Sequence, residues 1–104
     1  MDARERYDEL ADFLTFRYDD VELSRMMGMA CVKARGKIVA GFTRGAMVFK
    51  LTDLDRRTEA LALEGAHLFD PSGRGRPFRE WVVVPAEHAG RWETLAEHAL
   101  KPSA

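Results

Sequence analysis

The sequence has a single cysteine and no long hydrophobic run. The first argues against a disulfide-bonded protein, and the second argues against a membrane-spanning one. Cys31 is the single cysteine in 104 residues, so no internal disulfide can form, which fits a reducing cytoplasm. No stretch approaches the ~20 apolar residues of a membrane span. Residues 1–7 are charged from the second position onward, unlike a signal peptide. We therefore expect a cytoplasmic protein with no membrane partner.

The chain also lacks a strong charge of one sign. Its formal net charge is −1, with 46% hydrophobic and 32% charged residues. That balance is typical of a folded globular chain, and the length suits one domain over residues 1–104. The molecule as a whole has no strong attraction to nucleic acid or to an anionic membrane.

A catalytic or metal-binding constellation is missing as well. The three histidines, His67, His88 and His98, are far apart and show no spacing such as HxxxH. Cys31 has only Lys33 as a basic neighbour on its face, and a free cysteine commonly serves as a small buried apolar residue. We therefore expect no bound metal, no cofactor and no enzymatic activity.

Apolar periodicity and turn residues divide the chain into alternating helices and strands. The expected elements are a helix over 3–18, strands over 29–34, 37–43 and 46–51, a helix over 53–63, strands over 67–70 and 80–84, and a last helix that Pro102 terminates. Arg35-Gly36 and Arg44-Gly45 are two-residue links that suit tight hairpins, which make the neighbouring strands antiparallel. This order predicts an α+β fold, a two-layer α-β(3)-α-β(2)-α arrangement with one antiparallel sheet covered by helices.

The same periodicity predicts which side chains face the core. In the second and third expected strands, the inward sets are Ile38, Ala40 and Phe42, then Met47, Phe49 and Leu51. Thr52 is the expected N-cap of the middle helix, with Leu54, Leu61 and the Thr58 methyl facing inward. One core is expected to contain Tyr7, Leu10, Leu14, Phe42, Phe49, Leu61, Trp81, Val83, Trp92 and Leu95.

Charges are segregated along the chain. Residues 1–22 carry eight acids and three bases, whereas residues 23–50 carry six bases and no acid. Helix dipoles collect acids and strand ends collect lysine and arginine, which accounts for part of this pattern. The remainder fits either a self-complementary dimer surface or a weak nucleic-acid surface.

The loop over 71–77 and the residues that follow it are the strongest candidate for an anionic or acidic partner. The segment 71–79 contains Arg74, Arg76 and Arg79 and no acid, and Gly73 and Gly75 make its backbone pliable. Lys37, beside the hairpin turn at Arg35, supplies a further positive charge that the fold order allows on the same edge of the sheet. The alternative is a solvated loop whose charges only aid solubility.

Five short motifs occur in a distinctive order and spacing: Met26-Met27-Gly28-Met29, Gly36-Lys37-Ile38-Val39-Ala40, Met47-Val48-Phe49-Lys50-Leu51, Gly75-Arg76-Pro77-Phe78 and Trp81-Val82-Val83-Val84-Pro85. Together they resemble the N-terminal domain of the TfoX family of bacterial competence and transcription regulators. The resemblance covers about residues 5–100. It implies an α+β fold with one antiparallel sheet, related to that of YjbR-like proteins, and a regulatory role without the C-terminal helical domain of full-length TfoX. Met27 and Met29 replace the family's phenylalanine and second glycine.

Two functions follow as hypotheses. The first is a non-enzymatic regulatory or protein-interaction module, acting through a protein partner or through self-association as a homodimer. Exposure of the methionine cluster Met26, Met27 and Met29 would favour a protein partner, whereas burial would indicate core filling. The alternative is a weak nucleic-acid-binding domain that uses the basic hairpin ends and the loop from Arg74 to Arg79.

Overall fold

The computed structural model describes residues 2–26 and 28–101. Its elements, in chain order, are α1 (Ala3–Arg17), β1 (Val21–Met26), β2 (Met29–Ala34), β3 (Lys37–Thr43), β4 (Ala46–Lys50), α2 (Leu54–Leu61), β5 (His67–Leu68), β6 (Trp81–Pro85), the 3-10 helix η1 (Ala86–Arg91) and α3 (Trp92–Leu100). The expected roles of Met27 and Pro102 lie outside the described residues.

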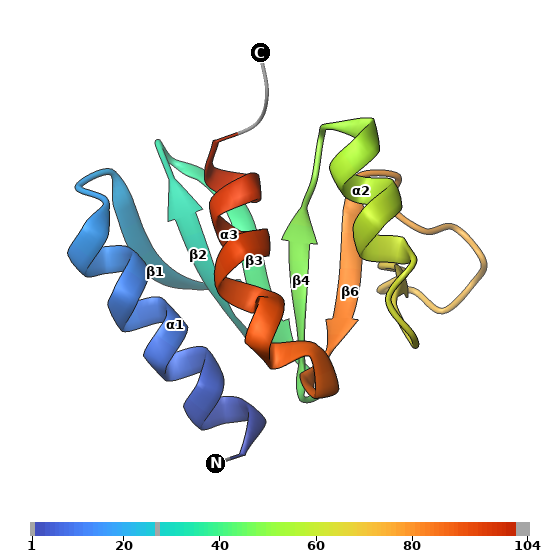
Figure 1. The fold of residues 1–104 in the computed structure, drawn as a ribbon, viewed down its shortest axis with the longest axis horizontal. Coiled ribbons are helices and arrows are strands. Elements are labelled where there is room, and N and C mark those ends of the chain that lie inside the picture. The colour runs from blue at the N-terminus through green and yellow to red at the C-terminus, as the bar shows by residue number, and fades with distance from the viewer. Residues whose placement is uncertain (1, 27, 102–104) are drawn as a thin grey trace.

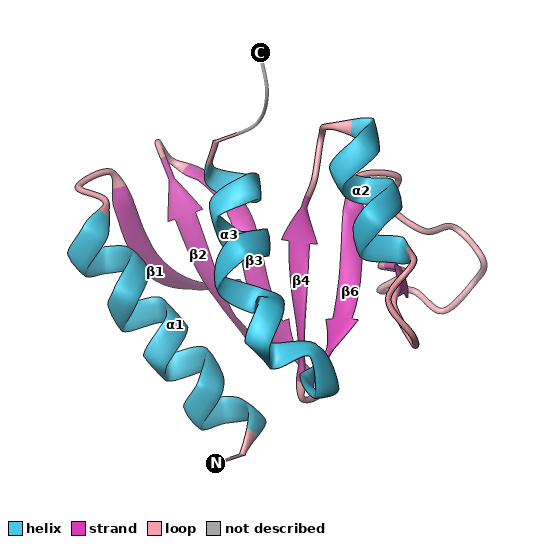
Figure 2. Ribbon diagram, viewed as in Figure 1, coloured by secondary structure: helices cyan, strands magenta, loops and turns pink. Residues whose placement is uncertain are grey.

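One sheet and one layer of helices make up the fold. The strands form a six-stranded sheet in the order β1-β2-β3-β4-β6-β5, and every neighbouring pair is antiparallel. Figures 1 and 2 show α1, α2 and α3 together on one face of this sheet. The predicted class, α+β with a single antiparallel sheet covered by helices, is therefore confirmed.

The structure adds one strand to the predicted order. Val21–Met26 forms β1, which pairs with β2 in unbroken register from Val21 opposite Ala34 to Met26 opposite Met29. In chain order the described residues therefore form one helix, four strands, a second helix, two strands and, after η1, a last helix. The strand was missed because it lies at an edge of the sheet, where Val21 is the one residue of the six that is fully buried.

An aspartate side chain caps the first turn of α1 and of α2. Asp2 caps α1, since its carboxylate accepts from the Glu5 N–H while the Glu5 side chain accepts from the Asp2 N–H. The predicted cap of α2 at Thr52 is wrong by one residue. Asp53 is the N-cap, and its carboxylate accepts from the Arg56 N–H at 3.0 Å.

The two predicted hairpins are confirmed. Arg35 and Gly36, and Arg44 and Gly45, all have positive φ, between 51° and 79°. Two successive residues in this conformation match the right-handed twist of the flanking strands, which explains why such short links join them. Arginine is strained there, and glycine is not.

The core lies between the sheet and the helices. Tyr7, Leu10 and Leu14 of α1 and Trp92 and Leu95 of α3 pack with sheet residues such as Phe49 in one cluster, as predicted, while Phe42 and Leu61 are partly buried against it. The prediction for β6 was wrong: Val82 and Val84 enter this cluster, and Val83 and Trp81 point to the other face. Residues 81–84 are all apolar, so the sequence alone does not show whether residues 81 and 83 or residues 82 and 84 face the core.

Two further core predictions were wrong. A β-bulge shifts the register, so that Val32 opposes Ala40 but Lys33 opposes Ile38. The extra residue, Val39, enters the core beside Ala40, and Ile38 turns to the other face with Lys33. In α2, Leu54 and Thr58 are exposed and Ala60 makes the buried contact instead. The helix is too short and too polar for its pattern to fix the inward face.

None of the helices within residues 2–26 and 28–101 combines the length and the apolar character that crossing a bilayer requires.

Candidate functional site

The predicted basic loop is exposed and closes on itself. Arg74, Arg76 and Arg79 are all exposed. At the base of the loop the Phe69 and Phe78 rings meet edge to face at 6.0 Å, and the Phe78 N–H donates to the Phe69 carbonyl at 2.8 Å. The arginines are therefore presented on a folded loop rather than on a free chain.

Asp70 organises this loop from within. Its carboxylate accepts from the Gly73 N–H at 3.0 Å, the Gly75 N–H at 2.8 Å and the Ser72 hydroxyl at 2.9 Å. Desolvation raises the pKa of Asp70, but hydrogen bonds from Ser72 and from the backbone of Gly75, Gly73 and Arg76 outweigh it and lower the pKa. The glycine N–H groups that would cradle an external anion are thus already bound to a carboxylate of the chain itself. The Asp-Pro-Ser-Gly sequence carried this signal, because aspartate before such residues commonly forms a turn with its own backbone.

Lys37 does not lie beside this loop. It starts β3, and β4 separates β3 from β6, which the loop precedes. In Figure 1 the loop lies at the right of the molecule beyond β6, whereas the β2–β3 turn lies at the upper left, beside the end of α3. The four predicted residues therefore form two separate positive regions, not one site.

The face of the sheet opposite the helices has a row of small residues through its centre. Cross-strand partners share a face, and the register connects one residue from each strand. This central row, in sheet order, is Ser24, Cys31, Gly41, Val48, Val83 and His67. Cys31 and Val48 are completely buried although they lie outside the helix-side core cluster. We call this side of the sheet the uncovered face.

Longer side chains on both sides of the central row shelter it. By alternation along the strands, Met29 lies on one side of the row, and Lys33, Lys50 and Trp81 lie on the other. These four residues are half-buried. Met29 reaches across the space left by Gly41, where an added Cβ would come within 2.8 Å of the Met29 Cε. The uncovered face thus combines an apolar floor with two lysine ammonium groups and an indole.

Cys31 lies in this floor and is poorly suited to nucleophilic chemistry. Burial raises the pKa of its thiol, although Lys33 and a hydrogen bond with Ser24 oppose that shift. The reactive form of cysteine is the thiolate, which is therefore disfavoured here.

The histidines have separate surroundings. His67 Nδ1 lies 3.1 Å from the Gly65 carbonyl oxygen, and His88 Nε2 lies 2.8 Å from that of Glu64. Burial and the nearby Arg56 lower the pKa of His98. Within the described ranges, no group of three or more His, Cys, Asp or Glu side chains could hold a metal ion.

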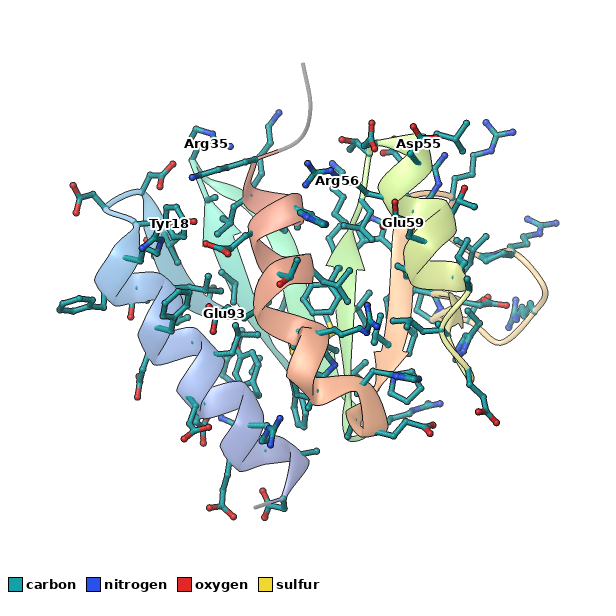
Figure 3. The ribbon with its side chains drawn as sticks, in the orientation of Figure 1. Tyr18, Arg35, Asp55, Arg56, Glu59 and Glu93 are labelled. Atoms are coloured by element: carbon teal, nitrogen blue, oxygen red, sulfur yellow. The ribbon has the colours of Figure 1, made fainter. Side chains whose placement is uncertain are left out.

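Polar contacts join the helices to one another near the end of α1. Figure 3 shows Tyr18 between α1 and α3. Its hydroxyl donates to Glu97, and Arg35 from the β2–β3 turn reaches both the Asp20 carboxylate at 2.7 Å and the Leu100 carbonyl at 3.2 Å. Glu97, Asp20 and Arg35 are therefore already engaged within the chain, and the uncovered face is the stronger candidate for contacts with another molecule.

Comparisons with models of protein families, with curated protein sequences and with solved structures find no match to this chain.

Proposed function

We propose that this chain is a non-enzymatic interaction module that binds a protein partner on the uncovered face of its sheet. The proposal keeps the regulatory role that the motifs resembling the N-terminal domain of TfoX imply, together with the cytoplasmic setting expected from a single cysteine. It does not depend on any bound metal or cofactor.

The observation that supports it is the apolar floor of the uncovered face. An antiparallel sheet with helices on one side ordinarily alternates apolar residues inward and polar residues outward. Here Cys31, Gly41, Val48 and Val83 form an apolar row on the side where Figure 2 shows no helix. The row itself is buried, so the surface that a partner would touch consists of the half-buried side chains beside it, which include Met29 and Trp81. Methionine and aromatic side chains are enriched in protein interfaces.

The flanking residues indicate the chemistry of the partner. Lys33 and Lys50 place two positive charges beside the floor. Glu22 lies directly across the strand pair from Lys33, and Trp81 lies directly across from Lys50, so Lys50 is the lysine without an acid opposite it in the sheet register. Tryptophan contributes strongly to protein interfaces, because one side chain provides a large contact area. The partner would therefore present apolar side chains next to carboxylates.

Nucleic acid is the second candidate, because lysines and a half-buried indole also suit a stacked, negatively charged strand. The sequence predicted that nucleic acid would bind at the basic hairpin ends together with the loop from Arg74 to Arg79. The loop's Gly73 and Gly75 N–H groups bind Asp70, which removes them as phosphate donors. Only the arginine side chains would remain for that function.

Affinity capture from a native lysate, with and without nuclease, tests the proposal. The variant Lys33→Glu with Lys50→Glu reverses both charges of the uncovered face. A matched control, Lys37→Glu with Arg74→Glu, makes the same change in net charge at the predicted basic regions. The expected result is one protein partner that survives nuclease, is lost with the first pair and is retained with the control.

Two outcomes would count against it. Loss of the partner with the control pair alone would place binding at the basic loop and hairpin. Loss of all captured material after nuclease treatment would favour the nucleic-acid function.

A further inference from the structure

The two edges of the sheet are built differently. β5 is two residues long and leads directly into the Asp70 loop. β1 is six residues long, contains no proline, and pairs with β2 without any register shift. Proteins usually shorten, bend or cover an edge strand, because its free backbone groups would otherwise pair with another strand. β5 has been shortened in this way, and β1 has not.

The register determines which backbone groups of β1 point outward. The Arg35 N–H donates to the Asp20 carbonyl at 3.3 Å, next to the pair of Val21 and Ala34, so Asp20 directs its backbone groups toward β2, and this direction recurs at every second residue. Val21, Leu23 and Arg25 then direct their N–H and C=O groups away from β2. The Val21 N–H donates instead to the Tyr18 carbonyl at 3.4 Å, which agrees with this direction. Leu23 and Arg25 are left to offer two donors and two acceptors to a further strand.

A groove runs along the same edge on the helix side. It has a volume of about 380 Å³, and Leu23, Arg25, Ala11, Asp8 and Asp12 are among the residues that line it. Leu23 is 48% exposed. Asp8 pairs with Arg4 at 3.1 Å, whereas Asp12 makes no ion pair with any residue of the described part of the chain. The groove therefore offers an apolar side chain and a free carboxylate next to an open strand edge.

We propose that β1 pairs with β1 of a second copy of this chain, antiparallel about a two-fold axis at Ser24. In this register Leu23 of each copy faces Arg25 of the other as a hydrogen-bonded pair. All four outward groups of Leu23 and Arg25 are then satisfied in both copies, and the Tyr18–Val21 contact is undisturbed. An interface of this kind closes on itself, because each copy contributes the same surface.

Charge complementarity selects a second copy as the occupant. Opposite Leu23, Arg25 of the second copy enters the helix-side groove that Asp12 lines. The two-fold axis repeats this contact, so each dimer gains two matched pairs of arginine and aspartate. Opposite charges across an interface direct association and fix its register. The paired edge adjoins the uncovered face at Ser24 but uses the backbone of β1 and the helix-side groove, so the inference goes beyond the proposed function and does not require it.

Sedimentation of the whole chain over a range of about 1 to 200 µM tests the pairing. The wild type should form dimers and no larger species. Leu23→Pro removes only an outward N–H, and Arg25→Glu places two acids together. Each should weaken dimerisation at least about tenfold. Adding Asp12→Arg to Arg25→Glu restores the opposite charges and should recover most of the lost affinity.

Leu54→Pro is the matched control. Leu54 is another exposed leucine, and as the first residue of α2 it tolerates proline. This variant should dimerise like the wild type, and circular dichroism should show all variants folded. A wild type that stays monomeric at the highest concentration overturns the inference. So does a dimer that neither Leu23→Pro nor Arg25→Glu weakens, a loss with Arg25→Glu that Asp12→Arg does not recover, or a wild type that grows into longer assemblies.

Discussion

Tyr18 donates a hydrogen bond of 2.6 Å to Glu97, which lies 79 residues later in the chain. The same carboxylate oxygen lies 3.5 Å from the Arg17 Nε, and the Lys101 ammonium lies 5.1 Å from the centre of the Tyr18 ring. One carboxylate thus joins the end of α1 to α3. Both helices cover the same face of the sheet, so this contact helps to hold the helical layer together.

Removing the Tyr18 hydroxyl tests that role. Tyr18→Phe leaves the ring in place but takes the donor away from Glu97. We expect the free energy of unfolding to fall by about 1–2 kcal/mol, because the hydrogen bond is partly buried and its acceptor is charged. Chemical denaturation measures the change. An unchanged midpoint would mean that the two helices are held by apolar packing alone.

The buried leucines of the two helices should matter more. Leu10 is 6% exposed and Leu95 is 7% exposed. Truncating either one to alanine should cost about 2–5 kcal/mol, since the cavity adds to the lost apolar burial. Leu54→Ala is the matched control, and it should cost less than about 0.5 kcal/mol because Leu54 is exposed. Losses below that value at both buried sites would reject the assigned helix faces.

Much of the fold could be predicted, because the turn residues and the apolar periodicity of the sequence agree with the observed helices and strands. The glycine-containing turns at Arg35-Gly36 and Arg44-Gly45 set the lengths of β2 and β3 to the residue. The errors arose where a local pattern was neutral. β1 is an exposed edge strand, and in β6 the choice between Val82 and Val83 as the inward residue depends on pairing with β4.

The candidate site could be predicted only in part. The glycine, proline and serine content of residues 71–77 predicted an exposed loop for its arginines. The separation of Lys37 from this loop depends on the order of the strands in the sheet, which the sequence does not show. The uncovered face could not be foreseen, because its central row takes one residue from each of six strands. Gly41 and Val48 become neighbours only through the register of β3 and β4.

The Asp70 loop predicts a local effect of acid. Because the pKa of Asp70 is lowered in the folded chain, its stabilising contribution is present above the ordinary value of 3.8. It is lost as the pH falls through the lower, folded pKa. Asp70→Asn should imitate that loss at neutral pH. Hydrogen exchange at Gly73 and Gly75 should then accelerate at least about tenfold, while the core amides stay unchanged. Equal protection in the variant and the wild type would show that the carboxylate does not order the loop.

Tyr7 predicts a loss of stability in alkali. Burial raises its pKa to about 12, with a smaller contribution from Cys31. The unfolded chain releases this proton near pH 10, so the free energy of unfolding falls between about pH 10 and 12. The loss attributable to Tyr7 approaches about 2–3 kcal/mol at the upper limit. Tyr7→Phe should remove that part of the pH dependence, and the two chains should differ most at the alkaline end. Parallel curves for both chains would contradict the assignment.

Site-specific photo-crosslinking tests the central claim most directly. A photoreactive residue at position 33 lies on the uncovered face, whereas one at Glu59 lies on α2, on the helix side in Figure 3. Illumination in a nuclease-treated lysate should join the partner protein to position 33 and leave position 59 without that product. Crosslinking of the partner to position 59 alone, or of no protein to position 33, would contradict the assignment of the uncovered face as the binding surface.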